Sequence, residues 1–129
     1  ADGTRSLLGV AVAGFPNLFT VTGPGSPSVM INVVTAIEQH VEWIDDCIGW
    51  LEQNSASVIE ADAEAETAWV DHVNETANET LYPQANSWYM GANIPGKARV
   101  FMPYVGGLRR FRLHCETVAE DGYTGFNVR

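Results

Sequence analysis

Ser26 and Ser28 lie in a glycine and proline turn whose composition is typical of a cofactor-binding loop. The segment reads Gly23-Pro24-Gly25-Ser26-Pro27-Ser28 and leads into an apolar helical pattern. Its glycines allow a tight turn and close approach to another molecule, while Ser26 suits a helix N-cap and Pro27 the first helical position. We therefore expect a strand, a turn and a helix start over residues 18–28. The positive end of that helix dipole could face an anionic or carbonyl-bearing cofactor.

Neither serine has the surroundings of a catalytic nucleophile. The chain contains no GxSxG elbow, and the sequence places no His or Asp to activate either hydroxyl, so both serines are interpreted as capping and positioning residues. The histidines His40, His72 and His114 lie on three separate predicted elements, without HExxH or CxxC spacing. A structural role is favoured for them, and a metal-binding helical protein is kept as an alternative hypothesis.

The composition describes one acidic domain. The chain has 129 residues, 46% of them hydrophobic, and a formal net charge of −9, which disfavours binding to nucleic acid or to an anionic membrane. No apolar run is long enough to span a bilayer, so we expect a cytoplasmic protein. Cys47 and Cys115 form no CxxC pair and are expected to be inert thiols.

A long amphipathic helix is predicted for residues 28–54, after a strand and turn over residues 1–27. Apolar residues recur at alternating intervals of four and three, which places them on one stripe of the helix. The stripe consists of Met30, Val34, Ile37, Val41, Ile44, Ile48 and Leu51. We expect this stripe to face the core, and a partner-binding helix is the alternative.

The rest of the chain divides into a second helix, an aromatic loop and a closing unit. The second helix is predicted for residues 57–80, with an exposed acidic outer face, and residues 81–97 form a loop that carries Trp88 and Tyr89. A loop this rich in large side chains is typical of a functional segment. Residues 98–129 are predicted to hold a strand at 99–102, a helix at 104–118 and a possible edge strand near Phe126.

The glycine pattern of a dinucleotide-binding fold is missing. The sequence has no GxGxxG and no P-loop, so the chain alone cannot assemble a conventional dinucleotide site. Arg109, Arg110 and Arg112 cluster near the start of the last predicted helix, and a solvated or salt-bridged surface is favoured for them. A cofactor that the first turn serves must therefore be held mainly by other residues.

Several ordered motifs resemble the C-terminal portion of class B flavin monooxygenases of the Baeyer-Villiger type, the family of phenylacetone and cyclohexanone monooxygenases, and the similarity extends over essentially the whole chain. The motifs are Gly14-Phe15-Pro16-Asn17-Leu18-Phe19, Gly23-Pro24-Gly25-Ser26-Pro27-Ser28, Glu38-Gln39-His40-Val41-Glu42-Trp43, Thr80-Leu81-Tyr82-Pro83, Ser87-Trp88-Tyr89, Gly91-Ala92-Asn93-Ile94-Pro95-Gly96-Lys97 and Gly122-Tyr123.

The resemblance implies a fold, an activity and a partner. The fold would be mixed α/β and predominantly helical, the C-terminal part of a Rossmann-like FAD-binding domain without its dinucleotide βαβ unit. The parent enzyme would use FAD, NADPH and dioxygen to insert oxygen beside a ketone carbonyl, giving an ester or lactone. The dinucleotide fingerprints and the catalytic arginine lie upstream in the family. The chain is thus expected to be a fragment without catalytic residues, inactive and free of cofactor alone, whose partner is the remainder of the monooxygenase.

The resemblance also implies roles for particular residues. The backbone near Val33 would face the isoalloxazine ring of FAD, and the side chains of Ser28, Val29 and Met30 would shape the substrate pocket. Trp88 would bind the ribose of NADP from the aromatic loop. The structural alternatives are a buried helix turn for residues 28–30 and a packing anchor for Trp88.

A second function hypothesis comes from the absent cofactor fold. Without an upstream partner, the apolar stripe and the Trp88 loop would expose surface that favours dimers. A non-catalytic, self-associating helical module is therefore the alternative to a monooxygenase fragment.

Overall fold

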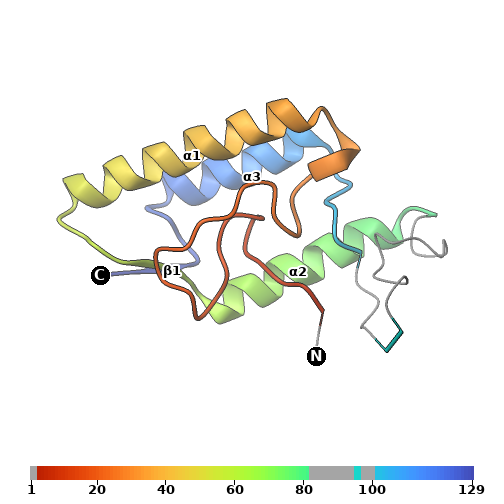
Figure 1. Cartoon of the computed structure of the whole chain (residues 1–129), viewed down its shortest axis with the longest axis horizontal. Helices are drawn as coiled ribbons and strands as arrows, with labels where there is room; N and C mark the ends of the chain where they lie inside the picture. Colours follow the sequence, from red (N-terminus) through yellow and green to blue (C-terminus); the bar gives the residue numbers. More distant parts are fainter. Residues whose placement is uncertain (1–2, 82–94, 97–100) are drawn as a thin grey trace.

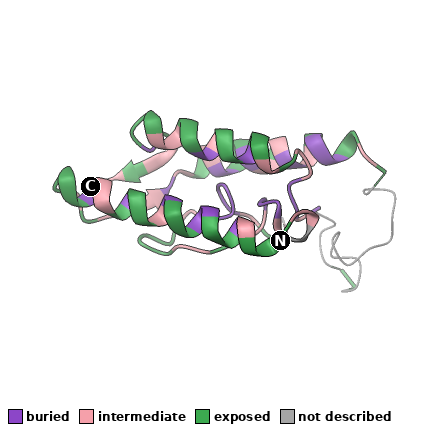
Figure 2. Ribbon diagram, turned by 90° about the horizontal axis from the view of Figure 1, so that it is seen from above, coloured by how far each residue is buried: buried purple, intermediate pink, exposed green. Residues whose placement is uncertain are grey.

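Two layers of helix enclose the first part of the chain. The computed structural model describes residues 3–81, 95–96 and 101–129. Helices α1 (Val33–Gln53) and α3 (Leu108–Glu120) pack side by side, α2 (Ala63–Asn78) lies opposite them, and the N-terminal loops run through the space between (Figure 1). Exposed residues line the outer sides of these helices, and buried residues lie toward the middle (Figure 2). The fold is mixed α/β, as expected, and its described part holds three α-helices and a two-stranded sheet.

The N-terminal segment is a series of turns, and the strand predicted before the glycine turn is wrong. Within residues 3–27 the described backbone forms only an isolated bridge between Leu7 and Ala11. Asn17 and Thr22 adopt left-handed φ values of 58° and 53°, which interrupt an extended conformation. The segment bonds to the rest of the chain through single residues, as where the N–H of Asn17 donates to the carbonyl of Ile59 at 2.9 Å.

Helix α1 begins at Val33, five residues later than predicted. A short 3₁₀ helix, η1 (Ser28–Met30), comes first, and the extended Ile31 separates it from α1. Asn32 is the N-cap, since its Oδ1 accepts a hydrogen bond from the N–H of Val34 at 3.0 Å. The expected cap, Ser26, donates its hydroxyl to the carbonyl of Gly23 at 2.7 Å instead. The end of α1 at Gln53 agrees with the prediction.

The predicted apolar stripe of this helix does not form its buried face. Of its members in α1, only Leu51 is buried, while Val34, Ile37, Val41 and Ile48 are exposed. The residues that face inward are Ala36, Gln39, His40, Trp43, Cys47 and Leu51. The expectation that the stripe faces the core of this chain is therefore wrong.

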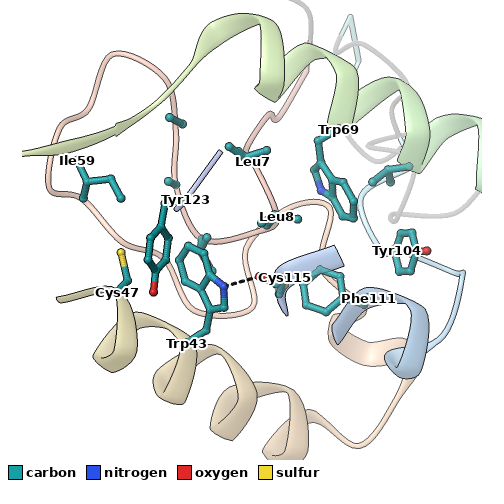
Figure 3. Close-up of a cluster of buried hydrophobic side chains, with 14 of the residues drawn as sticks. Leu7, Leu8, Trp43, Cys47, Ile59, Trp69, Tyr104, Phe111, Cys115 and Tyr123 are labelled. Atoms are coloured by element: carbon teal, nitrogen blue, oxygen red, sulfur yellow. Dashed lines mark hydrogen bonds between the residues drawn. The ribbon is translucent and has the colours of Figure 1, made fainter. Parts of the chain in front are cut away.

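Trp43 joins α1 to α3 at the centre of the core. Its indole N–H donates to the carbonyl of Cys115 at 2.9 Å, and its ring meets that of Tyr123 edge-on at 5.2 Å (Figure 3). The same cluster contains Leu7 and Leu8 of the N-terminal segment and Trp69 of α2. One core therefore connects both helical layers and the loops between them.

The predicted second helix is shorter because its first residues form a strand. Strand β1 (Ile59–Ala61) pairs antiparallel with β2 (Phe126–Val128), with Glu60 opposite Asn127. Helix α2 then starts at Ala63, because Asp62 Oδ1 accepts from the N–H groups of Glu64 and Ala65 and caps it. The prediction of helix at residues 57–62 is wrong, whereas the closing strand near Phe126 is present.

Glu66 departs from the exposed acidic face predicted for α2. Its side chain is buried, pairs with Arg5 Nε at 3.3 Å and accepts from the N–H of Ala13 at 3.1 Å. These bonds connect α2 to the N-terminal segment. A buried carboxylate needs such partners, because burial of an unpaired charge is unfavourable.

Helix α3 begins at Leu108 rather than residue 104, after Gly107 with a φ of 86°. In the strand predicted at 99–102, Phe101 and Met102 are not in a strand, and residues 99–100 lie outside the described part. Most of the aromatic loop, residues 82–94 with Trp88 among them, also lies outside it. Among the described helices, none combines the length and hydrophobicity needed to cross a membrane.

Candidate functional site

The glycine turn, residues 22–28, is the meeting point of the described structure. Its backbone bonds to the N-terminal segment, to both helical layers and to the segment that leads into α3. The N–H of Gly23 donates to Gly9 O at 3.0 Å, and Ser6 Oγ donates to the carbonyl of Pro24. The turn is therefore held against residues 6–9 by hydrogen bonds to two consecutive residues.

The segment after residue 100 holds the turn from another direction. The N–H of Gly25 donates to Met102 O at 2.7 Å, and the N–H of Tyr104 donates to Ser26 O at 2.7 Å. Tyr104 is itself fully buried in the core. These two bonds resemble a short piece of sheet pairing between segments almost 80 residues apart, and they orient the turn relative to α3.

Two side chains connect the turn to α1 and α2. His40 Nδ1 accepts from the N–H of Thr22 at 2.8 Å, and Trp69 Nε1 donates to Gly25 O at 3.2 Å. Both rings are buried. Since Nδ1 acts as the acceptor, neutral His40 carries its proton on Nε2. Burial lowers the pKa of His40 to about 4, against a smaller raising effect from the backbone of Leu8.

Close packing explains the glycines of this site. A Cβ on Gly23 would lie 2.6 Å from Gly9 O, and a Cβ on Gly25 would lie 2.8 Å from Trp69 Nε1. Gly25 also has a φ of 82°, which a side chain disfavours. On the facing segment, a Cβ on Gly9 would lie 2.7 Å from that of Ser26. The expectation that the glycines allow close approach is confirmed, although the approaching groups come from this chain.

The glycine turn leads into the residues predicted to line the substrate pocket, which lie shortly before α1. Ser28 has a left-handed φ of 44°, an unusual conformation for a serine that turns the chain into η1. Ser28 and Met30 are half-buried, and Val29 lies between them in η1. Val33 follows as the first residue of α1 and is 41% exposed. Its N–H has no acceptor within the helix and points away from the helix body.

The three histidines do not form a metal centre. His72 and His114 are neighbours, with ring centroids 5.0 Å apart, whereas His40 packs against Phe111. No group of three His, Cys, Asp or Glu side chains in the described ranges is arranged to hold a metal ion. Burial, followed by the nearby His72 and Arg110, lowers the pKa of His114. The rings of His72 and His114 therefore pack as part of an aromatic cluster with Trp69 and Tyr104.

Sequence reasoning missed the groups that hold the turn. Gly9, His40, Trp69 and Met102 come from four separate parts of the chain, and no spacing rule connects them. The one sign of these contacts in the sequence was His40, which lies next to the apolar stripe predicted for residues 28–54. Arg109, Arg110 and Arg112 are exposed on α3, as expected.

Comparison with known proteins identifies the class that the chain resembles. No protein-family model matches it. It is 46% identical over 125 residues to phenazine N-monooxygenase from Lysobacter antibioticus and 42% identical over 123 residues to the methyl acetate-forming acetone monooxygenase of Gordonia sp. strain TY-5. These alignments cover 97% and 95% of the chain but only 23% of each relative. The sequence is thus similar to a segment of monooxygenases.

Solved structures give the same result. The chain superposes on oxidized steroid monooxygenase bound to NADP with a TM-score of 0.90 and 44% identity, and on closed cyclohexanone monooxygenase with 0.91 and 47%. The two superpositions include 98% and 97% of this chain but only 23% of each solved structure. A further relative, 41% identical, is a Baeyer-Villiger monooxygenase from Pseudooceanicola batsensis. The resemblance to Baeyer-Villiger enzymes is confirmed, and the self-associating helical module is not favoured.

Substitution of Gly25 tests the close packing of the turn. Gly25→Ala combines a disfavoured φ with a Cβ that meets the Trp69 ring. Gly14→Ala is the matched control, because Gly14 has a φ of 85° and open space around it. We expect the control to lower the free energy of unfolding by roughly 1–2 kcal/mol and Gly25→Ala by about 1–3 kcal/mol more. Urea unfolding measures both, and equal losses would contradict the packing argument.

His40 predicts a loss of stability in acid. Its pKa is lowered to about 4 in the folded protein, so between pH 6.5 and pH 4 the unfolded chain binds a proton that the folded chain refuses. The stability is therefore complete above pH 6.5 and falls as the pH decreases through this range, by up to about 3 kcal/mol. Urea unfolding at several pH values measures the slope.

The control for this effect is His40→Asn, which keeps an acceptor for Thr22 but does not titrate. Its stability should vary less between pH 6.5 and pH 4 than that of the unaltered chain. A smaller slope of the same sign remains, because burial also lowers the pKa of His114. An unchanged slope in His40→Asn would show that the acid sensitivity lies elsewhere.

Proposed function

We propose that the chain is a segment of an FAD- and NADPH-dependent Baeyer-Villiger monooxygenase and forms one wall of its flavin site. The observation that carries the proposal is 40–47% identity to such monooxygenases over nearly the whole chain, with TM-scores of 0.90 and 0.91. In this proposal the segment is the C-terminal part of the FAD-binding domain and works in the cytoplasm. The dinucleotide βαβ unit belongs to the remaining sequence.

The start of α1 fits the flavin ring. The N–H of Val33 projects from a helix N-terminus, whose positive dipole end favours negative charge on a neighbouring group. Asn32 caps the helix through Val34 and leaves Val33 available. When bound, the flavin supplies electron transfer from NADPH to dioxygen. The task of this chain is to hold one N–H donor and one positive helix end at a constant position.

Residues Ser28, Val29 and Met30 suit the wall of a substrate pocket. They precede Val33 directly, and the strained Ser28 backbone is typical of a functional site. The hydrogen-bonded glycine turn lies directly before them, and in this proposal it holds them in place before substrate binds. We propose a ketone as the substrate class and Trp88 as a ligand of the NADP ribose from the aromatic loop.

A second candidate reaction is oxygen transfer to an aromatic ring nitrogen. It is favoured by one observation, the 46% identity to a protein named phenazine N-monooxygenase. That value is similar to the 42% identity to acetone monooxygenase. Both substrate classes therefore belong in the same assay.

The test is a full-length chimera in which this chain replaces the matched segment of the Gordonia acetone monooxygenase. We expect the chimera to retain FAD and to oxidise NADPH faster when a ketone is added, with an ester as product. Absorption at 340 nm and gas chromatography measure the two. A chimera that retains FAD but responds to neither ketones nor phenazines would contradict the proposal.

Val33→Pro removes the proposed flavin-facing donor with little effect on folding. Proline is well accepted at the first position of a helix, where its missing N–H has no helical partner, and Asn32 before it is already extended. In the chimera we expect kcat for ketone-dependent NADPH oxidation to fall about tenfold, equivalent to one hydrogen bond of about 1.5 kcal/mol.

The matched control is Val33→Ala, which shortens the same side chain and keeps the N–H. It should retain most of the activity. The melting temperature of each variant chain should remain within a few degrees of the original. Equal losses of kcat in the two variants would show that the side chain matters and the N–H donor does not.

A further inference from the structure

Helix α1 carries an exposed apolar surface beside its buried face. This outer stripe consists of Val33, Val34, Ile37, Val41 and Ile48, whose exposed fractions are 41%, 62%, 40%, 51% and 44%. Scattered exposed hydrophobic residues are normal on a protein, but a continuous row along one helix indicates a binding surface. The helix therefore has more apolar surface than the described part of the chain covers.

The geometry of an α-helix divides α1 into three parallel bands. At 3.6 residues per turn, the buried residues, the outer stripe and the exposed acidic residues each occupy roughly one third of the circumference. Glu38, Glu42 and Asp45 belong to the acidic band. The outer stripe adjoins the buried face, so about two thirds of the circumference of the helix is either buried or apolar. Such a helix is typical of a position between two bodies of protein.

The missing occupant is better explained by the rest of the enzyme than by a second copy of this chain. More than three quarters of each relative's length lies outside the matched segment. The stripe begins at Val33, which the proposed function places beside the flavin, so it is continuous with a site that the remaining sequence must share. A symmetric dimer through this stripe would bring two acidic bands together in a chain of net charge −9.

We infer that the outer stripe of α1 docks against the remaining part of the monooxygenase, alongside the flavin. This inference rests on the proposed function and adds the surface through which the segment is held. The buried face of α1 belongs to the core of this chain, and the outer stripe belongs to the interface. Docking along the stripe sets the position of the Val33 N–H relative to the cofactor.

Cysteine accessibility tests the inference. Val41→Cys places a thiol on the outer stripe, and Glu42→Cys places one on the acidic band beside it. The native thiols give little background, because both are buried and burial raises the pKa of Cys47 to about 11 and that of Cys115 to about 12. Reaction with a thiol reagent is measured in the 129-residue chain and in the full-length Gordonia chimera.

We expect Val41→Cys to react rapidly in the chain and at least tenfold more slowly in the chimera, while Glu42→Cys reacts alike in both. Equal rates for Val41→Cys in the two proteins would overturn the inference. Protection of Val41→Cys in the chain that grows with protein concentration would also overturn it, because the occupant would then be a second copy.

The labelling result is independent of turnover. Protection of Val41→Cys in an inactive chimera supports docking and leaves the proposed function without support. Rapid labelling of Val41→Cys in an active chimera refutes docking and leaves the proposed function intact. If Cys47 and Cys115 also react, the chimera has unfolded. The substitutions are then made at the aligned positions of the unaltered Gordonia enzyme, where the same difference between the two sites is expected.

Discussion

The backbone of the glycine turn bonds to the N-terminal segment, to α1, to α2 and to the segment that leads into α3, and this constraint determines how those parts are arranged. Gly23 and Pro24 bond to the N-terminal segment, Thr22 to α1, Gly25 to both α2 and Met102, and Ser26 to Tyr104. A side chain at Gly23 or Gly25 would break the close approach. The glycine turn therefore positions the two helical layers together with the ring contacts between α2 and α3, in which Trp69 and His72 pack against His114.

The hydrogen bonds that hold the glycine turn come from this chain alone, so in the proposed function this wall of the flavin site would already be ordered in the 129-residue chain. The turn is held by its own chain, so Ser28 can keep a left-handed conformation and α1 can start at a defined place. Preorganisation of this kind favours binding, because the ordering of the loop has already occurred during folding. In the proposed function, the cofactor and the rest of the enzyme would meet a surface whose shape is set by this chain.

The sequence predicted the helices better than their orientation. Alternating apolar spacing predicted the end of α1 to within one residue but its start five residues too early, and it indicated an apolar surface that exists. It could not tell whether that surface faces this chain or another, because periodicity records hydrophobicity and not the partner. Residues 59–61 were predicted as helix because local spacing carries no sign of their pairing with residues 126–128, which lie more than 60 positions further along the chain. The hydrogen bonds that hold the glycine turn could not be predicted for the same reason, since His40, Trp69 and Met102 come together only in the folded chain.

Native-state hydrogen exchange of the 129-residue chain tests most directly whether the turn is held without cofactor. The amide hydrogens of Thr22, Gly25 and Tyr104 donate to His40, Met102 and Ser26. If the hydrogen bonds of the glycine turn are as stable as the core, these three amides should exchange only by global unfolding, with the same free energy as the amide of Trp43 in α1. Exchange of these three amides through a local opening several kcal/mol lower than global unfolding would contradict the account.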